Sequence, residues 1–196
     1  MYMGKVTLGE GDALLINDVQ NDFLPGGRLA VRVGDAIIPV LNGYIDRFAP
    51  KKLPVFACRD WHPEDHCSFT TEGGPWPPHC VADTVGAAIA ADLALPDHTT
   101  LIDKSTDKTS HAYSCFEESP LDQTLRERNI KRLFIGGLAT DYGILATVMD
   151  GLKLGYTVCF LEDAIRAINL DRLDGIRAER QMYAKGAIPV TLEQIQ

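Results

Sequence analysis

A carboxylate and several imidazoles that could bind a metal ion lie in segment 59–82, which is rich in His, Pro, Gly and Trp. Asp60 and His62 are two residues apart, so an extended backbone points both side chains to the same side. A third ligand from His79 would complete a set that suits a divalent cation with open positions for water. His66 is either a further ligand or a group that orients one. Histidines also gather by chance near proline-rich turns, but the spacing favours a metal site.

Two further charged residues, Asp18 and Lys104, each follow a short apolar run. Alone, Asp18 would be a cap or turn residue and Lys104 a solvated surface lysine. Side by side, the lysine would keep the carboxylate charged and polarise a reacting group. Segment 135–143 is a glycine-flanked turn that leads into a helix, so its backbone N–H groups would stabilise an anion. A nucleophile on that first helical turn would be activated, yet the sequence has Gly143 there.

The elements that would position these residues alternate between strands and helices. Uniformly apolar runs of strand length predict strands buried on both faces, at 13–16, 54–58, 101–102, 133–135, 158–161 and 188–190. Helical spacing of apolar residues marks 35–48, 85–93, 120–129, 141–154 and 172–185. The alternation predicts an α/β fold, a single-domain doubly wound parallel sheet with helices on both faces. Ligands of such sheets bind outside the carboxyl ends of the strands.

Length, charge and cysteine content exclude several classes of protein. The 196 residues, 45% of them hydrophobic and 23% charged, predict one folded domain over 1–196. A net charge of −8 argues against nucleic acid and anionic membranes as partners. No apolar stretch reaches the roughly 18 residues of a membrane span and residues 1–12 show no signal-peptide core, so we expect a cytoplasmic protein. Five cysteines without C-x-x-C spacing predict reduced thiols.

Five sequence motifs occur in order along the chain. They are D-V-Q-N-D-F from Asp18, D-W-H-P-E-D-H-C-S-F from Asp60, W-P-P-H-C-V from Trp76, Lys104 itself, and G-L-A-T-D-Y from Gly137. This series resembles the nicotinamidases and pyrazinamidases, within the isochorismatase-like cysteine hydrolases. The D-x-H and W-P-P-H-C elements separate the chain from metal-free relatives of the isochorismatase type.

The resemblance implies a catalytic triad of Asp, Lys and Cys, of which two members are present. Asp18 would be the proton shuttle and Lys104 its charge-stabilising partner. The family motif ends T-D-Y-C, whereas this chain has Gly143 at the nucleophile position. The implied oxyanion hole consists of the N–H groups of Ala139 and Gly143, beside a cis peptide between Leu138 and Ala139.

The resemblance further implies a small-molecule ligand with an aromatic ring. Phe23, Trp76 and Tyr113 match positions that flank a pyridine ring in the family, although such aromatics are more often core residues. The implied cofactor is one divalent metal ion on Asp60 and the histidines, with zinc favoured over iron or manganese.

The implied activity is hydrolysis of nicotinamide, and of amides like pyrazinamide, to the carboxylate and ammonia. Glycine at the nucleophile position predicts an inactive form, with an engineered substitution favoured over a natural non-catalytic relative that only binds nicotinamide or nicotinate. An amidohydrolase of another small amide, such as an N-carbamoyl or ureido compound, is a third alternative. The sequence leaves oligomeric state open, a homo-oligomer included.

Overall fold

Six parallel strands form one sheet, in the order β3-β2-β1-β4-β5-β6. The structure is a computed structural model that describes residues 4–196. The strands are β1 (Asp12–Asn17), β2 (Val55–Asp60), β3 (Thr100–Lys104), β4 (Arg132–Leu138), β5 (Thr157–Arg166) and β6 (Ile188–Val190). Each contains one of the predicted apolar runs or most of it, because strands covered on both faces have no polar side to present.

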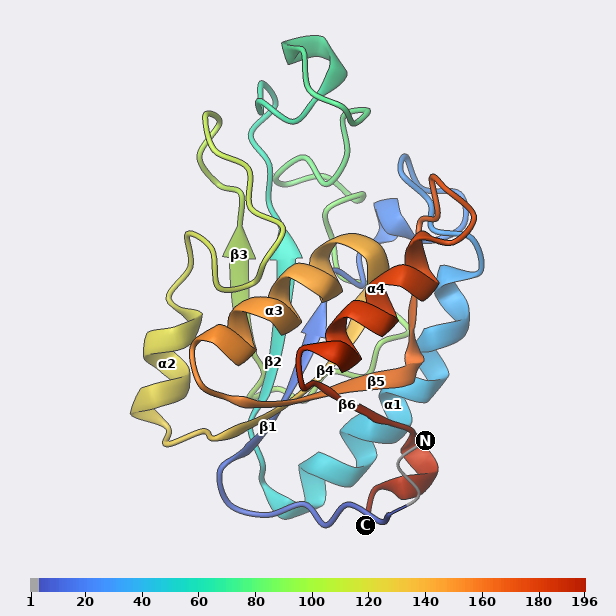
Figure 1. The fold of residues 1–196 in the computed structure, drawn as a ribbon. Helices are drawn as coiled ribbons and strands as arrows, with labels where there is room; N and C mark the ends of the chain where they lie inside the picture. Colours follow the sequence, from blue (N-terminus) through green and yellow to red (C-terminus); the bar gives the residue numbers. More distant parts are fainter. Residues whose placement is uncertain (1–3) are drawn as a thin grey trace.

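Four helices cover the two faces of this sheet (Figure 1). They are α1 (Ile38–Phe48), α2 (Leu121–Glu127), α3 (Leu145–Lys153) and α4 (Asp174–Ala184). Alternate residues of β1 show the two layers, because Leu14 shares one buried cluster with α1 and Leu15 shares the other with α2, α3 and α4. The predicted doubly wound α/β fold is therefore confirmed. Within residues 4–196, no helix combines the length and apolar character that a membrane crossing would need.

The predicted helix at 85–93 is wrong. The segment consists of turns, and its backbone groups bond to the chain after β1 instead of to one another. The N–H of Asn21 donates to the carbonyl of Ala88, and the N–H of Asp22 donates to the carbonyl of Gly86, both at 3.0 Å. Gly86 also lies against the Asp22 carboxylate, since a β-carbon at Gly86 would be 2.1 Å from Oδ2. Long-range hydrogen bonds thus outweigh the helical spacing of the apolar residues.

The order of the strands fixes where the site lies. The chain builds β1, β2 and β3 toward one edge and then returns to place β4 beside β1, so the topological switch point lies between β1 and β4. The register pairs Asn17 with Gly137 and Asp60 with Lys104, which brings four strand ends to one edge of the sheet. The long connections after β2 and β3 rise above this edge (Figure 1).

Candidate functional site

Asp60, His62 and His79 form a compact group of possible metal ligands at the end of β2. One ligand atom from each lies within 4.8 Å of the others, and all three residues are buried. His62 Nε2 is 3.5 Å and His79 Nε2 is 3.9 Å from Asp60 Oδ2. The structure therefore brings together the set of ligands that the spacing predicted.

The loop after β2 folds back on itself, which places His79 beside His62. The N–H of His62 donates to the carbonyl of Cys80 at 3.0 Å, and the N–H of Ala82 donates to the carbonyl of His62 at 2.8 Å. His79 Nδ1 lies 2.8 Å from the carbonyl of Pro77, which leaves Nε2 directed at the group. A histidine ligand is commonly oriented in this way through its second ring nitrogen.

The donor atoms in this group fit a divalent metal. Both ring nitrogens of His62 are buried without a hydrogen bond among residues 4–196, and Nε2 has only the 3.5 Å contact to Asp60 Oδ2, an arrangement that a metal ion on one nitrogen would make less costly. Burial lowers the pKa of His79, which favours the neutral imidazole that a metal requires. Ligand atoms on tetrahedral zinc lie about 3.3 Å apart. Distances of 3.5 and 3.9 Å to Asp60 Oδ2 are close to that spacing.

His66 lies beside the group rather than in it. Its Nδ1 is 2.7 Å from Ser68 Oγ and its Nε2 is 2.8 Å from the carbonyl of Ser110, so both nitrogens already have partners. Its ring centroid is 4.2 Å from that of His62. Of the two alternatives left by the sequence, this geometry favours a supporting residue over a ligand.

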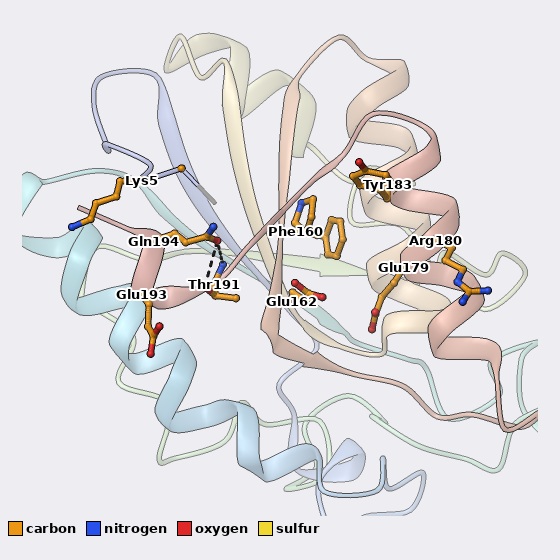
Figure 2. A pocket seen from close by; sticks show the side chains of 11 residues that line it. Lys5, Phe160, Glu162, Glu179, Arg180, Tyr183, Thr191, Glu193 and Gln194 are labelled. Carbon is orange, nitrogen blue, oxygen red and sulfur yellow. Dashed lines mark hydrogen bonds between the residues drawn. The ribbon is translucent and has the colours of Figure 1, made fainter. Parts of the chain in front are cut away.

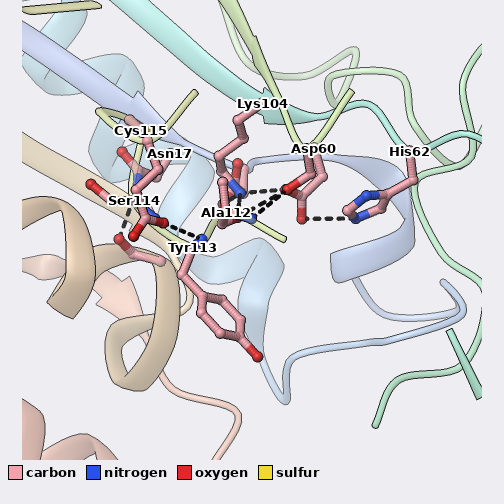
Figure 3. Close-up of polar contacts among 12 residues, drawn as sticks. Asn17, Asp60, His62, Lys104, Ala112, Tyr113, Ser114 and Cys115 are labelled. Carbon is pink, nitrogen blue, oxygen red and sulfur yellow. Dashed lines mark hydrogen bonds and ion pairs between the residues drawn. The ribbon is translucent and has the colours of Figure 1, made fainter. Parts of the chain in front are cut away.

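Lys104 joins the two carboxylates of the site. Its Nζ is 3.2 Å from Asp18 Oδ2 and also donates to Asp60 Oδ1, while the carbonyl of Ala112 lies 3.5 Å away. Figure 3 shows Lys104 and His62 approaching Asp60 from opposite sides, so one oxygen of Asp60 faces the lysine and the other faces the imidazoles. Lys104 is 2% exposed and Asp18 is 4% exposed, so water screens neither charge.

These contacts set the protonation states of the three buried groups. Burial raises the pKa of Asp18 to about 7 against the attraction of Lys104. For Asp60, burial also acts upward, but Lys104 and the two imidazoles outweigh it and hold the pKa well below its usual range. Burial would lower the pKa of Lys104, yet the two carboxylates hold it well above its usual range. A carboxyl group with a pKa of about 7 is suited to general acid-base chemistry at neutral pH.

Gly143 lies opposite Asp18, in the π-helical turn η5 (Thr140–Ile144) that follows β4. A β-carbon on Gly143 would be 3.0 Å from Asp18 Oδ2 and 3.3 Å from the carbonyl oxygen of Leu138. Its φ lies outside the left-handed region, so the backbone does not demand glycine. The bond between Leu138 and Ala139 is a cis peptide, as the resemblance implied.

Aromatic side chains enclose the space between Gly143 and the metal ligands. Trp76 Nε1 donates to the Tyr113 hydroxyl at 3.0 Å, and the Phe23 ring packs edge-on against His79 with centroids 5.5 Å apart. The three predicted ring-flanking residues line one cavity with the candidate catalytic and metal residues Asp18, Asp60, His79, Lys104, Ala139 and Gly143. His62 does not line this cavity and reaches the group from behind Asp60.

Two polar residues of this cavity, His111 and Tyr142, were missed by the sequence reasoning. The His111 ring is half-buried, 4.3 Å from that of Tyr113, and burial lowers its pKa to about 4. The sequence does contain a signal for His111. It lies two residues from Tyr113, and in an extended segment that spacing points both side chains to the same side. Tyr142 packs edge-on against Trp76 at 5.1 Å.

A larger hollow lies along the β5–β6 edge of the sheet, between α4, β5, β6 and the C-terminal turn (Figure 2). Glu162, Glu179 and Tyr183 are among its lining residues. Across the part of the chain that the structure describes, the only group of His, Cys, Asp or Glu positioned for a metal is the one at β2. The smaller cavity at the strand ends is therefore the candidate active site.

Comparison with known proteins places this chain in a family. The model of the isochorismatase domain matches residues 12–194. The nicotinamidase of Escherichia coli strain K12 is 36% identical over 92% of this chain and 94% of its own length. The nicotinamidase/pyrazinamidase of Mycobacterium tuberculosis is 36% identical over 81% of this chain and 88% of its own.

Solved structures agree with these relatives. The pyrazinamidase of Pyrococcus horikoshii, in complex with zinc, superposes with a TM-score of 0.89 at 44% identity, over 92% of this chain and 99% of that one. PnC1 from L. infantum, in complex with nicotinate, gives a TM-score of 0.91 at 34% identity over 98% of both chains. The resemblance carried by the motifs is thereby confirmed, and this chain belongs to the isochorismatase domain family.

Proposed function

We propose that this chain carries a nicotinamidase site that binds nicotinamide and lacks the nucleophile needed to hydrolyse it. The observation that carries the proposal is the position of Asp18, whose Oδ2 would be 3.0 Å from a β-carbon on Gly143. In a cysteine hydrolase, that is where the base must stand to take the thiol proton. The relatives named nicotinamidases support the substrate, as does the L. infantum complex with nicotinate.

One end of the proposed site binds the carboxamide. The N–H groups of Ala139 and Gly143 hold the carbonyl oxygen and would stabilise the charge that develops on it. Asp18, with a pKa of about 7, is placed to move a proton from a nucleophile at position 143 to the leaving nitrogen once such a nucleophile is supplied. Lys104 keeps this carboxylate in place and balances its charge at a distance of 3.2 Å.

The other end of the site binds the pyridine ring. Phe23, Trp76 and Tyr113 enclose the ring, and the bond from Trp76 Nε1 to the Tyr113 hydroxyl fixes the two larger aromatics relative to each other. Asp60, His62 and His79 would hold one divalent metal ion, with zinc favoured. When bound, this ion supplies an electrophilic centre for the ring nitrogen or for a water beside it.

Glycine at position 143 removes the nucleophile but none of the groups proposed to bind nicotinamide. Neither the aromatics, the metal ligands nor the backbone N–H groups need a thiol, so nicotinamide should still bind. Covalent catalysis needs an attacking atom, and removal of a nucleophile that acts together with its partners costs on the order of 10⁶ in turnover. We therefore expect the chain to bind nicotinamide without useful turnover.

The test compares this chain with Gly143→Cys, with Gly143→Ala as the control for added bulk. Calorimetry measures nicotinamide binding, and ammonia release measures turnover. We expect the zinc-loaded parent and Gly143→Cys to bind nicotinamide, and turnover in Gly143→Cys alone. The β-carbon contact of 3.0 Å requires the Asp18 carboxylate to move by a small amount. Equal turnover by the parent and Gly143→Cys would show that another group is the nucleophile.

A further inference from the structure

Three oxygen atoms surround the position that a side chain at Gly143 would occupy. A β-carbon there would meet Asp18 Oδ2 at 3.0 Å, the carbonyl of Leu138 at 3.3 Å and the carbonyl of Tyr113 at 3.5 Å. Gly143 lines the cavity together with Asp18 and Lys104, so this position is open to the ligand space. A small group that carries an acidic hydrogen would find an acceptor here, while a branched group would collide with the backbone carbonyls.

The second oxygen of the Asp18 carboxylate is free to accept a hydrogen bond. Asp18 is 4% exposed, and its Oδ1 has no hydrogen-bond partner within residues 4–196. A buried carboxylate oxygen without a partner is costly, so a group that donates a hydrogen to it would be favoured. The other oxygen, Oδ2, is held by Lys104 and faces Gly143.

The chain's own nearby thiols do not fill this position. Cys58 and Cys115 are both buried in the core cluster shared with α2 and α3, and neither lines the cavity. Burial raises the pKa of the Cys58 thiol well above its usual range, and the hydrogen bond to Cys115 adds to this. Cys67, Cys80 and Cys159 do not line the cavity either, so a thiol that acts beside Gly143 must come from solution.

We propose that the space beside Gly143 accepts a one-carbon aliphatic thiol as a free nucleophile, which makes this protein a thiol-dependent amidase. This inference rests on the proposed nicotinamide site and adds a second reactant to it. Methanethiol has the atoms of a cysteine side chain plus one hydrogen in place of the bond to the backbone. A free carbon must lie farther from the Gly143 α-carbon than a bonded β-carbon would, and the oxygens at 3.0 to 3.5 Å already crowd that position, so methanethiol, the smallest aliphatic thiol, is the one that needs the least displacement of its neighbours.

The first half of the reaction forms a thioester. Asp18 takes the thiol proton, the sulfur attacks the amide carbon, and the carbonyl electron pair moves to an oxygen held by the N–H groups of Ala139 and Gly143. When that pair returns, the carbon–nitrogen bond breaks. The proton on Asp18 passes to the leaving nitrogen, so the products are ammonia and the S-methyl thioester of nicotinate.

The second half regenerates the thiol. Asp18 takes a proton from water, the resulting hydroxide attacks the thioester carbon, and the carbon–sulfur bond breaks. The thiolate recovers the proton, and nicotinate leaves. The sum is nicotinamide plus water giving nicotinate plus ammonia, with no change of oxidation state and with methanethiol unchanged.

The expected rate lies between those of the parent and of Gly143→Cys. An attached nucleophile has the advantage of an effective molarity of about 10⁵ M or more, which a free thiol loses. Set against a loss of about 10⁶ in the parent, about 0.1 M methanethiol should contribute about as much turnover as the thiol-free protein has by itself. We therefore expect it to about double ammonia release at about 0.1 M, in proportion to its concentration, and to stay far below Gly143→Cys.

The experiment measures ammonia release from nicotinamide by the zinc-loaded protein, in a buffer with enough free zinc to keep the site loaded, as methanethiol is increased. The matched reagent is 2-methyl-2-propanethiol, which carries the same group on a branched carbon. Gly143→Ala, which places a methyl group in the space, is the matched variant. We expect rescue by methanethiol in the parent, little with the branched thiol or in Gly143→Ala, and S-methyl thioester in quenched samples by mass spectrometry.

Two outcomes would overturn the inference while the proposed function stands. In the first, the parent binds nicotinamide and Gly143→Cys turns it over, but methanethiol and the parent together release ammonia no faster than methanethiol and nicotinamide do in buffer alone. The other is equal rescue by the branched thiol or in Gly143→Ala, which would place the reaction outside this space. Loss of nicotinamide binding in both the parent and Gly143→Cys would instead refute the proposed function.

Discussion

Replacing Lys104 with methionine tests the buried ion network most directly. The Lys104 side chain is 2% exposed and lies between the carboxylates of Asp18 and Asp60. Methionine has similar length and keeps the packing of the stem, but it leaves two buried carboxylates without a cation. The substitution therefore removes the positive charge while the volume of the buried side chain stays similar.

The structure sets the size of the effect. Removing one partner of a buried ion pair costs about 3 to 5 kcal/mol, because the remaining charge is desolvated and unpaired. For a chain of about this length, each kcal/mol corresponds to about 2 to 4 °C in Tm, so we expect Lys104→Met to lower Tm by about 6 to 20 °C. Zinc should raise the Tm of the variant more than that of the parent, since it would replace part of the positive charge beside Asp60.

The loss should also depend on pH. The raised pKa of Lys104 means that its contribution is complete below about pH 10.4, the ordinary lysine pKa, and disappears as pH rises through the folded-state pKa. The lowered pKa of Asp60 means that its contribution is present above about pH 3.9 and disappears as pH falls through the folded-state value. The deficit of Lys104→Met is thus largest above about pH 7 and narrows as pH falls, first because Asp18 takes up its proton at about pH 7 and then, toward about pH 4, because Asp60 does.

The measurement is thermal unfolding by calorimetry at pH 8 and pH 5, with Lys108→Met as the matched control. Lys108 pairs with Asp65 at 2.8 Å, but both side chains are more than half exposed. Exposed pairs contribute about 0 to 1 kcal/mol, so the control should lose at most a few degrees. A Lys104→Met variant no less stable than Lys108→Met at pH 8 would refute the claim that the network is buried and charged.

Three further predictions concern the metal, the base and the loop. Loss of a residue that only orients a metal ligand weakens metal binding by roughly 10- to 100-fold, so His62→Ala, which removes a ligand itself, should weaken zinc binding by more than that. The control His98→Ala changes an exposed histidine and should leave zinc binding unchanged. Competition with a chelating dye measures the zinc affinity of both variants. Burial raises the pKa of Asp18 to about 7 in the folded protein, whereas the same carboxyl in the unfolded chain loses its proton at about pH 4. The free energy of unfolding should therefore fall as pH rises from about 4 to 7. Asp18→Asn should lack that fall, so that its Tm relative to the parent is higher at pH 8 than at pH 5; an unchanged difference would contradict the raised pKa. Gly86→Ala should lower the free energy of unfolding by about 1 to 3 kcal/mol, measured by urea unfolding, because its β-carbon would collide with the Asp22 carboxylate. Gly9→Ala has open space around its β-carbon and should change the free energy of unfolding little.

The parts of the site that sequence reasoning predicted are those set by local geometry. Uniformly apolar runs located the strands, and strand ends then located Asp18, Lys104 and the turn before Gly143. The two-residue spacing of Asp60 and His62 holds because the backbone stays extended past the end of β2. Such features depend on a few neighbouring residues, which the sequence shows directly.

The parts that it missed depend on contacts between distant segments. The spacing of apolar residues in 85–93 is helical, but hydrogen bonds to the chain after β1 hold the segment in turns. His111 carries no motif of its own and enters the cavity because the connection after β3 crosses the strand ends. Lys104 was expected beside Asp18, and only the register of β2 against β3 reveals Asp60 as its second partner.

That second partner couples the two ends of the candidate site. Lys104 contacts Asp60 through Oδ1 and leaves Oδ2 facing the imidazoles, so the same cation orients a candidate metal ligand and balances the charge of Asp18, the proposed proton shuttle. A metal ion on Asp60 would withdraw charge from this carboxylate, weaken its attraction for Lys104, and leave the lysine freer to stabilise ionised Asp18. Metal binding at the ring end should therefore lower the pKa of Asp18 at the amide end. The base would then be ready to accept a proton when the ring site is loaded.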